Sequence, residues 1–292
     1  MRVVLFGATG FIGRALLPAL AAEHEVVAVS RSPQPPQKGV TWVVADVTDT
    51  PAVRRALEGA DVVYYLVHSL GSPDFEERDV AGAQTTASEA ETAGVRQIVY
   101  LGGLGEEGEE LSPHLRSRLE TGRALASGAV PLTTLRAAVV VGKGSAAFET
   151  IVALVDRLPV MVAPRWVSTP TQPIALADTV RYLAAVAGRE ETIGESYDLG
   201  GPEVMTYRQM IERVAGIRGK QRVIIEVPVL TPFLSSLWLH LVTPVGASVA
   251  RPLIEGLRNP TVAEDTRIRD LVPFPLTPFD RAAREALGIV GR

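Results

Sequence analysis

The first half of the chain alternates short runs of apolar residues with longer segments of helical periodicity. The apolar runs lack the polar alternation of a half-exposed strand, which is typical of strands covered on both faces. They occupy residues 3–6, 25–29, 40–44, 61–67, 96–101 and 132–135. Helices are predicted between them over residues 11–22, 51–57, 74–93 and 114–126. This βα alternation predicts an α/β fold in which a doubly wound parallel sheet carries helices on both faces.

The pattern changes after Gly142. Prolines become frequent, and irregular segments separate predicted helices over 177–187, 207–217 and 280–287 and a predicted strand over 222–227. We therefore expect two unequal domains. Residues 1–142 form the sheet domain, and residues 143–292 form a smaller C-terminal α/β lobe that is interleaved with the last elements of the sheet. The length of 292 residues agrees with this division, because domains average roughly 150 residues.

Composition removes several classes of chemistry. The chain has no cysteine, which excludes disulfides, thiolate zinc sites, iron–sulfur clusters and cysteine nucleophiles. Its four histidines form no H-x-x-x-H pair, so no metal site is predicted. The formal net charge of -4 argues against a nucleic-acid partner, which would require a basic surface. A small molecule is therefore the expected ligand.

The strongest chemical signal is a glycine-rich turn with the spacing G-x-x-G-x-x-G, which follows a predicted strand and opens a predicted helix. In that setting Gly7 permits a tight turn, Gly10 lets the backbone approach a pyrophosphate, and Gly13 lets the helix pack against the sheet. The N–H groups at the start of the helix favour an anion. The alternative is an ordinary glycine-rich turn. We predict a Rossmann domain whose cofactor-binding residues include Gly7, Thr9, Gly10, Phe11, Ile12 and Gly13.

The residues after the second and third strands bear on the choice of cofactor. NAD sites usually place an acid after the second strand, where it binds the ribose 2′-hydroxyl. Arg31 stands there between two serines, which suits a 2′-phosphate, so we expect NADP(H) in preference to NAD(H). Asp46 and Val47, after the third strand, are predicted to lie near the adenine. Two structural alternatives stay open: Arg31 as a solvated loop residue, and Asp46 as a turn or helix-capping residue.

These features together resemble the short-chain dehydrogenase/reductase superfamily in its extended and atypical, NmrA-like branches. The resemblance rests on the glycine turn, on Asp46 and Val47, and on the predicted strand over 61–67. Two later segments, residues 173–178 and 196–202, support it, and it extends to about residue 219. It implies an NAD(P)-dependent oxidoreductase of Rossmann fold whose later lobe holds the substrate.

The sequence departs from this family at the catalytic positions. Active members carry a serine after the fifth strand and a Tyr-x-x-x-Lys pair at the start of the next helix. Here glycine stands at the serine place, His114 at the tyrosine place and Arg118 at the lysine place. His114 would then donate a proton and Arg118 would contact the cofactor, because residues four apart share a helix face.

Other interpretations of these positions remain open. Like-charge repulsion from Arg118 would oppose protonation of His114, and His114 would then be a partly exposed residue at a helix start. His68, followed by Ser69 after the fourth strand, is a second catalytic candidate, because substrates of open α/β sheets bind beyond the carboxyl ends of the strands. Its alternative is a structural loop histidine.

Residues 227–250 carry no charged side chain, but prolines interrupt them and leave 233–243 as the longest proline-free piece. A membrane-spanning helix needs roughly 20 apolar residues, so none is predicted. The segment has four open interpretations: core, wall of an apolar pocket, homodimer contact, or surface in peripheral contact with a membrane. The N-terminus lacks the pattern of a secretory signal, so we expect a cytoplasmic protein.

Two functions follow from these observations. The first is an NADPH-dependent oxidoreductase acting on a small apolar carbonyl or quinone-type substrate. The second is a non-catalytic, NADP(H)-sensing regulatory protein of the NmrA-like type, which the replacement of the Tyr-x-x-x-Lys pair favours.

Overall fold

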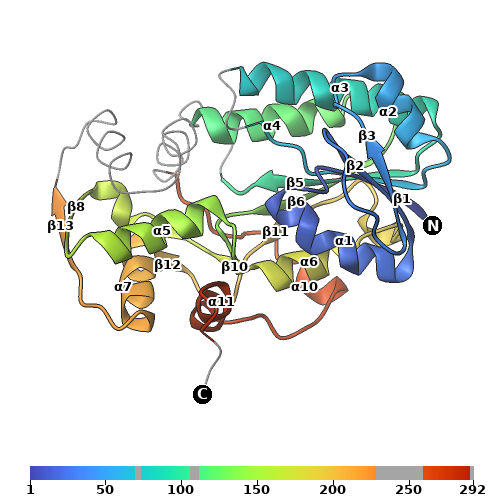
Figure 1. The fold of residues 1–292 in the computed structure, drawn as a ribbon. Coiled ribbons are helices and arrows are strands. Elements are labelled where there is room, and N and C mark those ends of the chain that lie inside the picture. The colour runs from blue at the N-terminus through green and yellow to red at the C-terminus, as the bar shows by residue number, and fades with distance from the viewer. Residues whose placement is uncertain (70–73, 106–111, 228–258, 290–292) are drawn as a thin grey trace.

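A seven-stranded parallel sheet forms the centre of the larger half of the molecule (Figure 1). The computed structural model describes residues 1–69, 74–105, 112–227 and 259–289, apart from the side chains of Pro113 and His114. The sheet order is β11-β6-β5-β4-β1-β2-β3, which confirms the predicted doubly wound arrangement. Its strands are β1 (Arg2–Phe6), β2 (Glu25–Ser30), β3 (Val40–Val44), β4 (Val62–Tyr65), β5 (Gln97–Gly103), β6 (Leu132–Ala137) and β11 (Ser196–Leu199).

Helices cover both faces of this sheet. On one face lie α2 (Thr50–Leu57), α3 (Phe75–Thr92) and α4 (Pro113–Leu125), and on the other lie α1 (Phe11–Glu23) and α6 (Leu176–Ala185) (Figure 1). Successive residues of β1 therefore enter different cores: Leu5 packs under α1 and α6, whereas Phe6 packs under the other helices. Burying one such side chain contributes about 1.5–3 kcal/mol, which accounts for strands without polar positions.

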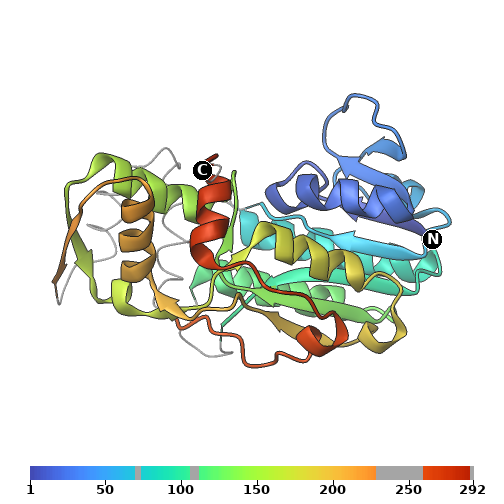
Figure 2. The same ribbon diagram turned by 90° about the horizontal axis from the view of Figure 1, so that it is seen from below.

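The smaller lobe lies beside the sheet and has a core of its own (Figure 2). Phe148, Met210 and Ile211 are among the buried residues of that core, and Phe279 joins them from near the C-terminus. Between its segments the chain returns to the large sheet through α6 and β11, so the two halves interleave in sequence. The remaining elements are β7 (Val140–Val141), α5 (Ala146–Arg157), β8 (Val160–Pro164), η1 (Arg165–Ser168), β9 (Pro170–Thr171), β10 (Ile174–Ala175), η2 (Glu190–Thr192), β12 (Met205–Thr206), α7 (Tyr207–Ile217), β13 (Val223–Val227), α10 (Ile268–Leu271) and α11 (Phe279–Ala286).

The uncharged segment over 227–250 lies outside the described residues except for Val227, the last residue of β13. Across the part of the chain that the structure describes, no helix is both long enough and apolar enough to cross a membrane.

Asp178, near the start of α6, holds the segment that leads to the C-terminal helix. Asp178 is 2% exposed, and its carboxylate accepts hydrogen bonds from the Thr277 N–H at 2.7 Å and the Thr277 hydroxyl at 3.0 Å. We expect Asp178→Ala to lower the free energy of unfolding by about 2–4 kcal/mol, because both donors lose their acceptor. Urea denaturation measures this loss. Thr277→Val removes only the hydroxyl and serves as the control, with an expected loss of about 1 kcal/mol. Equal losses in the two variants would contradict the assignment.

Candidate cofactor site

The turn between β1 and α1 adopts a conformation that two of its glycines require. Gly7 has a φ of 80°, and a Cβ there would lie 2.6 Å from the carbonyl oxygen of Leu66. A Cβ on Gly13 would lie 2.2 Å from the carbonyl oxygen of Gly7. Gly10 differs, because its φ of -73° is open to any residue and its Cβ would meet Gly7 at 3.2 Å. Gly7 and Gly13 therefore shape the turn, whereas Gly10 keeps its outer side free of a side chain.

The start of α1 offers backbone donors at this turn. Gly10 is the N-cap of the helix and makes no side-chain capping bond to its first N–H groups. Such groups, with the positive end of the helix dipole, attract an anion. The turn follows β1, whose neighbours are β2 and β4, so it lies where the strand order reverses. Ligands of open α/β sheets bind at this switch point.

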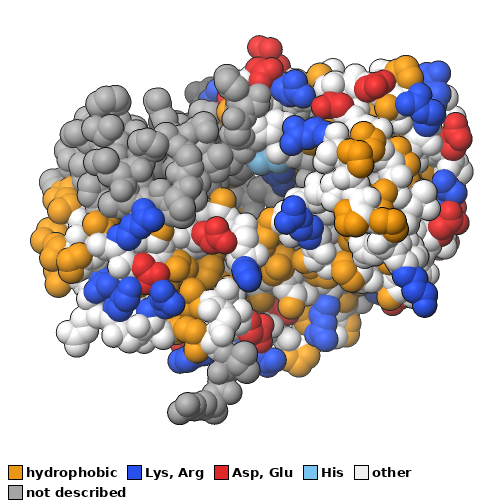
Figure 3. Space-filling view, in the orientation of Figure 1, with side chains coloured by type: hydrophobic (Ala, Val, Ile, Leu, Met, Phe, Trp, Pro, Cys, Tyr) orange, Lys and Arg blue, Asp and Glu red, His pale blue; other side chains and the backbone are white. Residues whose placement is uncertain are grey.

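A cavity opens at the carboxyl ends of β1, β2, β3 and β4, and the surface is hollowed between the sheet and the smaller lobe (Figure 3). It gathers most of the residues that the sequence assigns to cofactor binding, although they come from three separate turns. Their backbones and side chains form one continuous lining, so an extended ligand can contact all three turns. The predicted residues that line it are Gly7, Thr9, Gly10, Arg31, Asp46 and Val47.

Three predicted residues of the turn lie beside this cavity without lining it. Phe11 and Ile12 begin α1, and Gly13 is buried where the helix meets the turn. The ring of Phe11 lies beside the start of the smaller lobe, and its Cδ2 would lie 3.5 Å from a Cβ on Gly144. Cofactor binding by Phe11, Ile12 and Gly13 therefore stays a prediction, and it would involve their backbone atoms.

Two arginines and one aspartate surround the part of the cavity beyond β2 and β3. Asp46 accepts hydrogen bonds from the N–H of Thr48 at 3.0 Å and from its hydroxyl at 2.7 Å, so it also forms a local turn. Arg78, from the first turn of α3, approaches Asp46 at 3.4 Å. The backbone hydrogen bond from Thr48 outweighs burial, and with Arg78 and Arg31 it holds the pKa of Asp46 below its usual value. Arg78 could not be predicted from the sequence, because it lies 32 residues from Asp46 in an ordinary polar helix turn.

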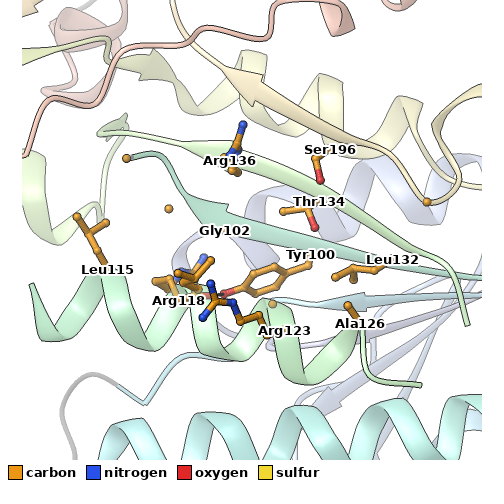
Figure 4. A pocket seen from close by; sticks show the side chains of 15 residues that line it. Tyr100, Gly102, Leu115, Arg118, Arg123, Ala126, Leu132, Thr134, Arg136 and Ser196 are labelled. Carbon is orange, nitrogen blue, oxygen red and sulfur yellow. Dashed lines mark hydrogen bonds between the residues drawn. The ribbon is translucent and has the colours of Figure 1, made fainter. Parts of the chain in front are cut away.

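Arg118 lines a different cavity, between α4 and the strands β5, β6 and β11 (Figure 4). Its guanidinium lies over the ring of Tyr100, 5.1 Å from the centroid, and donates a hydrogen bond to the carbonyl oxygen of Leu101. The Tyr100 hydroxyl in turn donates to the carbonyl oxygen of Arg118 at 2.9 Å. Arg118 therefore contacts β5 in this structure, and contact with a cofactor stays a prediction.

The residues at the serine place and the tyrosine place are Gly103 and His114. Gly103 ends β5, and a Cβ there would lie 3.1 Å from the side chain of Leu115 on α4, so glycine at the serine place lets α4 pack closely on β5. His114 lies in the first turn of α4, and its side chain is outside the described part of the structure. Its proposed role stays a prediction. His68 and Ser69, by contrast, line the cavity at the glycine turn.

The parallel sheet, the glycine turn at the switch point and the cavity around it define a dinucleotide-binding Rossmann protein. Residues 7–136 match the protein family described as NAD(P)H-binding. Over these residues the chain is similar to an NAD(P)H-binding domain, which agrees with the predicted Rossmann fold. Among the described residues, no group of three or more histidines and acids is placed to hold a metal ion.

Known relatives of the chain include reductases. A (4-alkanoyl-5-oxo-2,5-dihydrofuran-3-yl)methyl phosphate reductase of Streptomyces griseus is 28% identical over 229 residues, which cover 75% of this chain and 74% of that protein. An uncharacterised protein of Mycobacterium tuberculosis is 30% identical over 79% of this chain, which spans only 25% of that relative. An NADPH-dependent quinone oxidoreductase of Escherichia coli, solved with NADPH, superimposes with a TM-score of 0.79 at 21% identity and covers 98% of this chain and all of its own. The chain is thus related to NAD(P)-dependent oxidoreductases.

Proposed function

We propose that this protein is an NADPH-dependent oxidoreductase that reduces a small apolar carbonyl or quinone-type compound. The observation that carries the proposal is the single cavity in which Gly7, Gly10 and Arg31 meet. The glycine turn and the start of α1 would hold the pyrophosphate, and a nicotinamide cofactor bound there would supply a hydride.

The choice of NADPH rests on charge at the far part of the cavity. Arg31 follows β2 at the place where NAD-binding proteins of this fold carry an acid, and Arg78 lines the same cavity 3.4 Å from Asp46. Two guanidinium groups suit the doubly charged 2′-phosphate of NADP(H), and neither is needed by the 2′-hydroxyl of NAD(H).

The substrate class rests on two kinds of support. One curated relative is named as a reductase, and one solved structure of similar fold is named as an NADPH-dependent quinone oxidoreductase. The cavity wall after β4 contains Leu66 and Val67, so an apolar compound would find apolar surface beside the cofactor. We assign the substrate to the junction of the two proposed domains, 1–142 and 143–292, where Cδ2 of Phe11 would lie 3.5 Å from a Cβ on Gly144.

Binding of the two cofactors tests the proposal directly. We expect NADPH to bind at least about tenfold more tightly than NADH, a difference of about 1.4 kcal/mol, as measured by thermal shift and by nucleotide fluorescence. NADPH should then be oxidised by a member of a panel of quinones, aldehydes and ketones. Equal or tighter binding of NADH would contradict the assignment to NADPH.

A second function, an NADP(H)-sensing regulator, is favoured by the position of Arg118. The residue at the lysine place contacts β5, and the serine place is glycine, so the family's usual proton-donating set is missing. Tight NADPH binding without oxidation against the whole panel would support the sensor and contradict the enzyme.

A further inference from the structure

A histidine and a buried aspartate form a close pair at the cofactor cavity. His68 follows β4 and lines the cavity beside Gly7 and Leu66. Asp79 lies on α3 and is 1% exposed. The Nδ1 atom of His68 is 2.6 Å from Oδ2 of Asp79. The pair therefore links the cavity wall to the interior of the helical layer that covers the sheet.

Further donors hold the carboxylate of Asp79 in place. The N–H of Ser69 donates to Oδ1 at 2.9 Å, and the hydroxyl of Ser117 on α4 approaches Oδ2 at 3.5 Å. Burial acts to raise the pKa of Asp79, but the hydrogen bonds from His68 and Ser69 outweigh it and hold that pKa below its usual value. The carboxylate is thus ionised and accepts only, so Nδ1 of His68 must carry the hydrogen between them.

This arrangement leaves Nε2 as the atom of His68 that gains and loses a proton. Burial lowers the pKa of His68 below its usual value, and the positive charge of Arg118 on α4 acts in the same direction. Asp79 on α3 opposes both. The ring also meets Phe75 of α3 edge-on, with 6.3 Å between centroids, which limits its rotation. His68 is therefore a fixed group with a defined exchangeable proton on a cofactor cavity.

We propose that His68 is the proton donor of this reductase and that Asp79 is its positioning residue. The inference rests on the proposed function, which supplies the hydride. An electrophilic carbon of the carbonyl compound, or of the conjugated system of the quinone, receives that hydride, and an electron pair moves onto the carbonyl oxygen. The oxygen takes the proton from Nε2 of the His68 imidazolium, and the neutral ring regains a proton from solvent. Two electrons and two hydrogens are thereby added to the substrate.

The position of the pair explains how activity can persist without the Tyr-x-x-x-Lys pair. At the lysine place Arg118 is engaged with β5, while its neighbour Ser117 reaches Asp79. Helix α4 therefore supports a proton donor that comes from the end of β4. Three segments, the β4 end, α3 and α4, meet at one carboxylate.

The tautomer of His68 tests the pair without any activity. Imidazole ¹⁵N shifts in the free protein should show a hydrogen on Nδ1 of His68. In Asp79→Asn the side-chain amide oxygen of the new asparagine would still accept the hydrogen bond from the Ser69 N–H, so its amide nitrogen would face Nδ1 of His68. Because an amide nitrogen only donates, Nδ1 must then accept, and the ring hydrogen of neutral His68 should move to Nε2. His24→Gln identifies one of the four histidine signals and is the control variant. A wild-type hydrogen on Nε2, or an unchanged tautomer in Asp79→Asn, would overturn the inference.

Kinetics with NADPH and the quinone menadione test the role itself. We expect His68→Gln to lower kcat on the order of 100-fold, with the Kd for NADPH changed by less than about threefold. His24→Gln should match wild type. The rate should fall as pH rises above the lowered pKa of His68, and Asp79→Asn should move this fall to still lower pH, because the carboxylate supports the imidazolium. Wild-type kcat in His68→Gln would remove the proposed donor.

The outcomes separate the two proposals. Failure to bind NADPH contradicts the proposal that the protein is an NADPH-dependent oxidoreductase. The tautomer measurement still shows whether His68 and Asp79 form the proposed hydrogen-bonded pair. Turnover that survives His68→Gln contradicts the proton donor and leaves the oxidoreductase standing. If Asp79→Asn does not fold, the wild-type spectrum and His68→Gln decide the outcome.

Discussion

Gly10→Val is expected to abolish NADPH binding and leave the fold intact. Gly10 is exposed, its φ of -73° is accessible to valine, and its Cβ would meet only the carbonyl oxygen of Gly7 at 3.2 Å. The branched side chain would project from the turn into the cavity where the pyrophosphate is proposed to lie. We expect the Kd for NADPH to rise at least about 100-fold, which is about 2.7 kcal/mol, in a fluorescence titration.

Gly13→Ala is the matched comparison, because it adds a smaller group three residues away. In this variant we expect the stability of the fold to fall, whereas in Gly10→Val we expect it to be kept. A Cβ added at Gly13 would lie 2.2 Å from the carbonyl oxygen of Gly7, so the turn or the helix must move. We expect a lower melting temperature for Gly13→Ala and a nearly unchanged one for Gly10→Val. NADPH binding at wild-type strength in Gly10→Val would place the cofactor elsewhere.

The sequence predicted every strand of the sheet except β11, because each of the others carries its own signal. A strand covered on both faces is mostly apolar along its whole length, and two parallel neighbours are joined by a crossover helix. Both the apolar run and the helical segment can be recognised within a short stretch of sequence. The glycine turn was predictable for the same reason, since Gly7 and Gly13 are required by contacts within or beside the turn. Strand ends were less certain: β5 runs to Gly103, two residues beyond the predicted end, because it continues to pair with β6.

The sequence did not reveal which side chains meet across the cavity. Asp79 reaches His68 from α3, and Arg78, its neighbour on the same helix, reaches Asp46. Both contacts depend on how α3 rotates and packs over the sheet, which a single sequence does not record. Arg118 lies on α4, and its side chain lies over Tyr100, because a long flexible side chain can turn toward a nearby acceptor and ring.

Arg31→Asp is expected to reverse the cofactor preference. The substitution removes a cation and adds an anion where the 2′-phosphate is proposed to lie. The new carboxylate can also accept a hydrogen bond from the ribose 2′-hydroxyl of NADH. We expect the ratio of the Kd for NADPH to the Kd for NADH to rise on the order of 100-fold, or about 2.7 kcal/mol. Titration at two salt concentrations adds a second measure, because the wild-type preference should weaken as ionic strength rises.

Arg78→Ala separates the two guanidinium groups. Arg78 already approaches Asp46 at 3.4 Å, so part of its charge is balanced by that carboxylate, and its loss should change the ratio less than the loss of Arg31. Arg31→Ala is the matched neutral variant for this comparison. If Arg31→Ala leaves the ratio unchanged while Arg78→Ala lowers the affinity for NADPH, the 2′-phosphate lies on the α3 side of the cavity, and the assignment of Arg31 is wrong. If neither variant changes the ratio, the charge of this cavity does not select the cofactor.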